Sequence, residues 1–440
     1  MAGSPGPTRS DEGLRRDIGL LGASFLALNG MIGAGIFALP AVLAADLGAF
    51  SPWVFLLFGL AMLCVVAAFG ELASYFSTSG GPVRYVSEAF GAFAGFQTGW
   101  LYYISRLTAL AANTNVLILY AASLWPALSE VAPRASALIL ICAAFTFINV
   151  VGVKRAVRVL DGLTFLKVVP LLGLVFYGLY VAFDNLTIPK QLPQLSAIEG
   201  TALLVIYAFL GFENSVVPAG ETANPRRTIP RSLLITVIGT AFLYFLVQLS
   251  YIAVVGVRSV EGGPLIEFGR VLAGPAGATL ITLVAIFSVA GNVMGAMVGA
   301  PRTTFALARE GSLPAWFAHV SKRYGTPDIS IIFLGLLACI LAVTGSFVWL
   351  AVISTLARLI VYGLSVVALP RIRRRMGQET PRGARAVLAN YAVPAVALGT
   401  CIFAIAQSKG ESWQMLLLFV VFGGLLYLGA RHFSQAPQVP

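Results

Sequence analysis

Charged residues are scarce in this sequence. Only 11% of its 440 residues are Asp, Glu, Lys or Arg, while 58% are hydrophobic and the mean hydropathy is +0.88. Soluble domains contain about 25% charged residues, and a water-facing surface cannot be built from less than half of that. The composition therefore excludes a soluble enzyme of two or three domains, which is the usual expectation for this length. It also excludes a disordered chain, which needs the opposite balance.

Cysteine and histidine are also rare, and neither is spaced to bind a metal. His319 and His432 lie far apart in predicted loop and tail segments. The HExxH, GxSxG and CxxC patterns are absent, which argues against a membrane enzyme. We therefore expect no catalytic residue, metal or other cofactor. The four cysteines lie inside apolar stretches, which indicates no disulfide framework: Cys64, Cys142, Cys339 and Cys401.

Long apolar runs fill most of the chain instead. A membrane-spanning helix needs about 20 mostly apolar residues, and residues 1–17 precede a run too long for the core of a cleaved signal peptide. The sequence predicts an all-α polytopic membrane protein without a soluble domain. Its twelve candidate spans are 18–45, 52–76, 91–124, 135–151, 159–183, 198–220, 231–256, 275–301, 329–345, 347–369, 388–407 and 412–430.

The 29 Lys and Arg residues are distributed unevenly over this topology. The face that holds both termini carries 21 of them, the opposite face carries 5, and 3 lie within spans. Basic residues gather in cytoplasmic loops, so both termini are predicted to be cytoplasmic. The same bias accounts for the net charge of +11. The expected partner of this chain is therefore a lipid bilayer and not a nucleic acid.

Two predicted spans are interrupted by glycine and proline near their middle. The first contains residues 29–40, with Gly30, Gly33, Gly35 and Pro40, and the sixth contains residues 207–221. Such paired interruptions in corresponding positions of two halves point to a transporter binding site. A broken helix offers free N–H groups for a carboxylate and free carbonyls for an ammonium group. The pattern therefore favours a site for the head group of an α-amino acid.

Five motifs in order resemble the amino acid–polyamine–organocation (APC) superfamily. They are Gly-Ala-Gly-Ile-Phe (33–37), Gly-Gly-Pro-Val-Arg-Tyr (80–85), Gly-Phe-Glu (211–213), residues 221–231 and residues 308–314. The resemblance implies a LeuT-like fold, a five-plus-five inverted repeat with helices 1 and 6 broken, followed by two trailing helices. It also implies secondary transport of amino acids or related amines by alternating access. The implied units are 1–17, 18–183, 198–370, 388–430 and 431–440.

The resemblance also implies which residues bind substrate. The carboxylate would meet the backbone at Ile32, Gly33, Ala34 and Gly35. The ammonium group would meet carbonyls around Phe209 and Leu210, with Tyr207 and Phe209 as aromatic walls or gates. The side-chain half of the pocket would be lined by Arg106, Leu110, Asn292 and Ala296.

Lys167 lies about eight residues into the fifth span, with apolar residues on both sides. Ionisable residues within spans are costly and are candidates for function, although a lysine can also extend its side chain to the membrane interface. In the resembling family a lysine of this span replaces a sodium ion. Withdrawal from water lowers the pKa of a lysine, so Lys167 is interpreted as the proton-coupling residue.

Two arginines within spans need partners because arginine stays charged. For Arg106 the favoured interpretation is a gating or structural pair with Glu213, and the alternatives are contact with substrate or a water-filled vestibule. Arg358 is expected to form a structural pair with Glu71.

The sequence therefore favours a proton-coupled, sodium-independent amino-acid transporter. Arg106 would repel a cationic side chain, so neutral or acidic substrates are favoured. The alternative within this class is an exchanger of amines or cationic amino acids. A non-transporting sensor would need a soluble output domain, and a channel would need a polar stripe or rings of identical residues.

Overall fold

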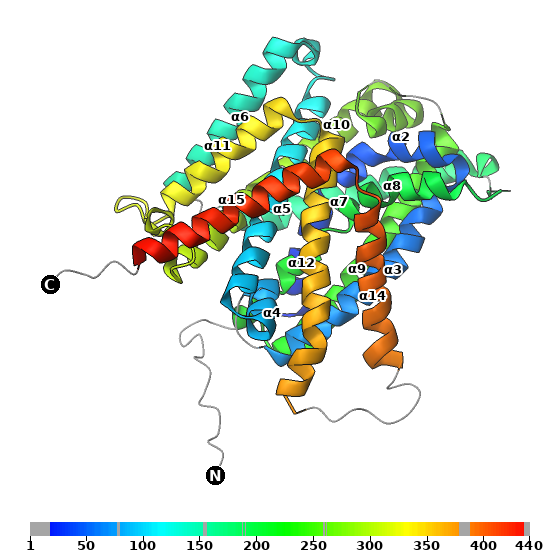
Figure 1. Ribbon diagram of the computed structural model, residues 1–440. Coiled ribbons are helices and arrows are strands. Elements are labelled where there is room, and N and C mark those ends of the chain that lie inside the picture. Colours follow the sequence, from blue (N-terminus) through cyan, green and yellow to red (C-terminus); the bar gives the residue numbers. More distant parts are fainter. Residues whose placement is uncertain are drawn as a thin grey trace.

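Helices make up the structure of this chain (Figure 1). The computed structural model describes residues 18–434 except 77–79, 153–155, 187, 190, 258–259, 261 and 378–387. Within these residues the strand-like pairing is confined to one isolated bridge between Ile18 and Thr222. The bridge ties the start of the first helix to the segment that follows the sixth predicted span.

The first half of the chain contains the first five predicted spans and one additional short helix. The first span is divided into two helices, and the short helix α4 precedes the third span. The helices are α1 (Leu20–Met31), α2 (Gly35–Leu47), α3 (Ser51–Tyr75), α4 (Gly81–Phe90), α5 (Ala92–Ala121), α6 (Val131–Val151) and α7 (Ala156–Val181).

The second half begins with another divided span, in which a helix is followed by two short 3-10 turns. The elements are α8 (Leu195–Ala208), η4 (Phe212–Ser215), η5 (Ala219–Glu221), α9 (Pro225–Val254), α10 (Pro264–Arg309), α11 (Asp328–Thr344), α12 (Phe347–Arg375), α14 (Val393–Ala406) and α15 (Gly410–Ser434). In α10 the backbone leaves helical geometry at Ala273 and at Gly274, where φ is +59°. Glycine tolerates this value, so the long span starts at Pro275.

The exterior of the bundle is apolar. In the described part of the chain, seven helical segments are long and apolar enough to cross a membrane, and one of them joins α2 to α3. Large side chains of α6 and α15 face outward, such as Leu140 (68% exposed) and Leu417 (63% exposed). Such a surface is costly in water and suits lipid, because a bilayer solvates apolar side chains.

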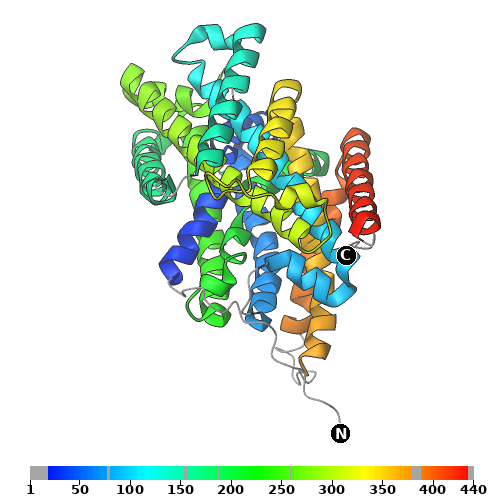
Figure 2. The ribbon, with the colours of Figure 1, turned by 90° about the vertical axis from the view of Figure 1, so that its left-hand side faces the viewer.

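Helices from the two halves pack against each other in pairs. The pairs are α3 with α9, α5 with α10 and α6 with α11, and α6 and α11 run side by side (Figure 1). The trailing helices lie outside these pairs, with α14 against α3 and α12, and α15 against α5 and α12. The link between α5 and α6 lies at the top in both views, and α4 and the end of α12 lie towards the bottom (Figure 2).

Candidate functional site

The first site element is the gap between α1 and α2. Helix α1 ends at Met31, and Ile32 has a non-helical ψ of 85°. Gly33 N donates to Met31 O at 2.9 Å, and α2 begins at Gly35. The first turn of a helix leaves its N–H groups without helical acceptors. Among the described residues, the N–H groups of Gly35 and Ile36 have no backbone acceptor.

The side-chain amides of two asparagines, one from α5 and one from α10, form hydrogen bonds to the backbone at this gap. Asn113 Oδ1 of α5 accepts from Ala34 N at 2.8 Å. Asn292 Nδ2 of α10 donates to the carbonyls of Asn29 at 3.0 Å and Gly30 at 3.3 Å. The two amides therefore cap the broken ends of α1 and α2.

Gly33 lies between these amides. A Cβ at this position would lie 3.1 Å from both Asn113 Oδ1 and Asn292 Nδ2, which is closer than such contacts normally are. The site therefore has no room for a larger residue without displacing a cap.

The second site element is the gap that follows α8. Helix α8 ends at Ala208, and Gly211 has φ of +112°, which favours glycine. A Cβ on Gly211 would lie 2.9 Å from the Cα of Gly30. The backbones of the two broken spans are thus in direct contact, and the two glycines permit this approach.

A buried ion pair anchors the second gap. The Glu213 side chain is fully buried and forms an ion pair with Arg358 Nη1 of α12. Tyr362 Oη donates to Glu213 Oε2 at 2.7 Å, and Gly211 N donates to the same oxygen at 3.2 Å. This arrangement corrects the expected pairing of Glu213 with Arg106, because the carboxylate is already occupied by three donors from α12 and its own turn.

The expected pairing of Arg358 with Glu71 is also wrong. Arg358 Nε donates to Ser105 Oγ of α5 at 2.8 Å, in addition to its contact with Glu213. Glu71 instead accepts two hydrogen bonds from Arg373, at 2.6 and 2.5 Å. Arg373 lies four helical turns further along α12, where it reaches the end of α3 that carries Glu71.

Arg106 has no carboxylate within ion-pair distance among the described residues. Its Nη1 donates to Tyr102 Oη at 3.0 Å, and its guanidinium lies over the Tyr102 ring at 5.4 Å from the centroid. The other side of the guanidinium faces α10, where a Cβ on Gly299 would lie 3.2 Å from Arg106 Nη2. The side chain is half-buried.

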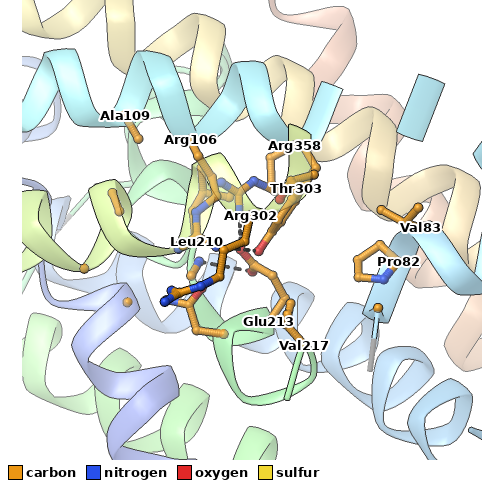
Figure 3. Close-up of a pocket in the computed structure, with 18 of the residues that line it drawn as sticks. Pro82, Val83, Arg106, Ala109, Leu210, Glu213, Val217, Arg302, Thr303 and Arg358 are labelled. Atoms are coloured by element: carbon orange, nitrogen blue, oxygen red, sulfur yellow. Dashed lines mark hydrogen bonds and ion pairs between the residues drawn. The ribbon is translucent and has the colours of Figure 1, made fainter. Parts of the chain in front are cut away.

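These elements surround one cavity of about 870 Å³. Figure 3 shows Arg106, Arg302 and Arg358 on the wall of this cavity together with Glu213, from α5, α10, α12 and the turn after α8. Exposed lining residues such as Arg84, Arg302 and Glu310 mark its mouth. The residues expected from the sequence that line it are Gly33, Ala34, Gly35, Arg106, Tyr207, Leu210, Glu213, Asn292 and Ala296.

Other expected site residues lie elsewhere. Ile32, Leu110 and Phe209 are at most 1% exposed and are not part of the cavity wall. Lys167 belongs to α7, and its side chain lies outside the part of the chain that the structure describes. Asn113 is a site residue that is not among those predicted from the sequence. An amide within an apolar span is nevertheless the kind of signal that marks a functional position.

The side of the site opposite the mouth is closed by aromatic contacts. Tyr207 and Phe347 pack edge to face at 5.8 Å between centroids, and so do Phe37 and Tyr120. Tyr120 Oη also donates to Phe37 O at 2.8 Å and accepts from Leu265 N at 3.3 Å. The residues of α5 that line the cavity run from Ala92 to Asn113, and none follows Asn113, so the cavity reaches the two gaps from one side.

An apolar helical bundle with a cavity that ends on two broken helices defines a membrane transport protein. The family model described as amino acid permease matches residues 18–426. This chain therefore belongs to the amino acid permease family. It is a multi-pass membrane transporter and not an enzyme.

Characterised relatives differ in substrate. The methylthioribose transporter of Bacillus subtilis is 26% identical, over 94% of this chain and 93% of that protein. The serine/threonine exchanger SteT of the same species is 28% identical over 84% and 86%, and the cadaverine/lysine antiporter of Escherichia coli is 27% identical over 70% of each chain.

The fold is also similar to that of a solved structure. The crystal structure of MhsT in complex with L-phenylalanine matches 90% of this chain and all of that chain, with a TM-score of 0.64 and 14% identity. At this identity the match supports the LeuT-like fold and carries nothing about the substrate of this chain.

Proposed function

We propose that this protein is a secondary active transporter that moves amino acids across the cytoplasmic membrane by alternating access, coupled to protons and independent of sodium. The observation that carries this proposal is the cavity that ends on both broken helices, next to the capping amides of Asn113 and Asn292.

The chemistry of the gaps suits the head group of an amino acid. The first turn of α2 presents the N–H groups of Gly35 and Ile36 and the positive end of a helix dipole, which attract a carboxylate. The carbonyls that follow α8, beside Tyr207 and Leu210, suit an ammonium group. The two chemistries lie side by side because the backbones at Gly30 and Gly211 are in contact.

The one-sided access of the cavity supports alternating access. Its mouth is lined by Arg84, Arg302 and Arg431, residues that the distribution of basic residues assigns to the cytoplasmic face. With both termini in the cytoplasm, this conformation is open to the inside and closed to the outside. The outside is closed by the Tyr207–Phe347 and Phe37–Tyr120 contacts.

The paired packing of helices supports the inverted repeat with twelve spans. In a five-plus-five repeat, spans 2 and 7, 3 and 8, and 4 and 9 occupy equivalent positions. These are the pairs α3 with α9, α5 with α10 and α6 with α11. The two capping amides follow the same relation, because Asn113 lies in span 3 and Asn292 in span 8.

Proton coupling is assigned to Lys167 because a lysine inside a span exchanges a proton near neutral pH when it is withdrawn from water. The favoured substrates are neutral or acidic amino acids, since the arginines of the cavity repel a cationic side chain. The similarity to a cadaverine/lysine antiporter supports the second candidate, an exchanger of amines or cationic amino acids.

The test is uptake of radiolabelled amino acids and polyamines into proteoliposomes with an imposed pH gradient and no sodium. We expect accumulation of at least one amino acid, abolished by a protonophore. A strict sodium requirement would contradict proton coupling. Transport of amines without transport of amino acids would support the second candidate, the exchanger of amines.

A further inference from the structure

Arg106 is a cation in the wall of the cavity without a protein carboxylate to neutralise it in the described part of the chain. Its neighbour Arg358 is neutralised by Glu213, so that pair adds little net charge to the cavity. The ring of Tyr102 lies against both guanidiniums, at 5.4 Å from Arg106 and 4.6 Å from Arg358. A half-buried arginine without a counterion is unfavourable, and an anion that binds beside it removes this cost.

The remaining charges on the cavity wall are mostly positive. Arg84, Arg302 and Arg431 line the cavity together with one further carboxylate, Glu310. The positive charge of Arg302 is offset in part by the carboxylate of Glu221. Arg302 Nη1 also donates a hydrogen bond to Val298 O at 2.8 Å. Those three arginines are exposed and screened by water, whereas Arg106 lies further along the wall beside the buried Arg358. The field of the cavity therefore favours an anion.

The position of Arg106 along α5 matches the site for the head group. Arg106, Ala109 and Asn113 follow one face of the helix and all line the cavity. Arg106 and Asn113 are separated by two turns, about 10 Å along the axis. Asn113 caps α2 where the carboxylate of the substrate would bind. The Arg106 guanidinium, which is bonded to Tyr102 Oη, lies on the mouth side of that position, where the side chain of the substrate would extend.

Gly299 leaves room for the guanidinium in this orientation. Because α10 has no side chain at Gly299, the Arg106 guanidinium rests against its backbone, and a Cβ would lie 3.2 Å from Nη2. The hydrogen bond to Tyr102 Oη holds the other edge. The bond to Tyr102 thus orients the side chain before any substrate is present, which reduces the entropy lost on binding.

We propose that Arg106 binds a carboxylate on the side chain of the substrate, so that the transporter prefers acidic amino acids to their uncharged amides. This inference rests on the proposed function and narrows its substrate class from amino acids without a cationic side chain to dicarboxylic ones. Arginine suits this role because its planar guanidinium donates to both oxygens of a carboxylate.

The test compares two pairs of matched ligands, L-glutamate with L-glutamine and L-aspartate with L-asparagine. Binding to the purified full-length protein is measured by thermal shift and by isothermal titration calorimetry. One acidic member is expected to bind about tenfold more tightly than its amide, because it gains a charge-assisted contact. Arg106→Gln should remove this ratio and leave the affinity for the amide within about threefold, and Arg106→Lys should retain part of it.

The matched control is Arg270→Gln. Arg270 is 60% exposed and forms an exposed ion pair with Glu267 at 3.1 Å, away from the cavity. Arg270→Gln should leave the ratio of the affinities for acid and amide unchanged. Gly299→Ala keeps the positive charge but pushes the guanidinium aside, so it should lower the ratio even if Arg106→Gln fails to fold.

Three outcomes overturn the proposal. Equal binding of acid and amide by the wild type excludes an acidic subsite, and transport of neutral amino acids alongside that result leaves the proposed function intact. An equal loss of both ligands in Arg106→Gln assigns the residue a structural role only. Absence of binding and transport for every amino acid refutes the proposed function itself.

Discussion

Replacing Glu213 with glutamine tests the most buried charge of the site. The carboxylate is 0% exposed and accepts hydrogen bonds from Arg358, Tyr362 and the N–H group of Gly211. Glutamine keeps the shape of the side chain but leaves the Arg358 cation without its counterion. Breaking a buried pair in this way costs about 3–5 kcal/mol of the free energy of unfolding. Arg358→Gln leaves the carboxylate alone and should lower stability by a similar amount.

The double variant measures the interaction energy between the two charged side chains, apart from the effect of each single change. With both charges removed, neither is left uncompensated, so Glu213→Gln/Arg358→Gln should be more stable than the sum of the single losses predicts, by about 0.5–3 kcal/mol. Tyr362→Phe removes one hydrogen bond to the carboxylate and should cost about 1.5–3 kcal/mol.

The measurement is equilibrium unfolding by SDS in mixed micelles, followed by fluorescence of the six tryptophans. The control pair is Arg375 with Glu88, which also joins α12 to another helix but is 59% and 38% exposed. Its disruption should cost less than about 1 kcal/mol. Losses below about 1 kcal/mol for both Glu213→Gln and Arg358→Gln, or strict additivity in the double variant, would show that the pair does not anchor the gap.

Three further changes test other parts of the site. Gly33→Val should abolish substrate binding in a thermal-shift assay, because its side chain meets the two capping amides, whereas Gly239→Val, which has open space around it, should bind normally; unchanged affinity in Gly33→Val would place the site elsewhere. Asn113→Ala removes the cap of Ala34 N and should weaken binding by about fivefold to thirtyfold, as the loss of about 1–2 kcal/mol gives; a wild-type affinity measured by calorimetry would contradict the capping role. Lys167→Ala should leave folded protein whose uptake into proteoliposomes no longer responds to a pH gradient, and loss of the folded protein in size-exclusion chromatography would instead indicate a structural role.

The sequence by itself determined the kind of protein and the position of both helix breaks. In a bilayer every backbone N–H and carbonyl must be bonded within the protein, so long apolar runs become helices whatever their neighbours are. The interruptions can also be located in the sequence, because glycine and proline weaken a helix at their own positions. Gly33 and Gly35 lie where α1 gives way to α2, and Gly211 lies where α8 ends.

The partners of the charged residues were decided only by the tertiary structure. Glu213 and Arg358 are 145 positions apart, and Glu71 and Arg373 are 302 positions apart. Hydropathy placed Arg106 and Arg358 within spans, but not on the side of a helix that faces a given neighbour. That depends on how each helix is rotated and which helix it packs against. The cap from Asn113 and the exposure of Arg106 to the cavity follow from the same packing of α5 against α10 and α12.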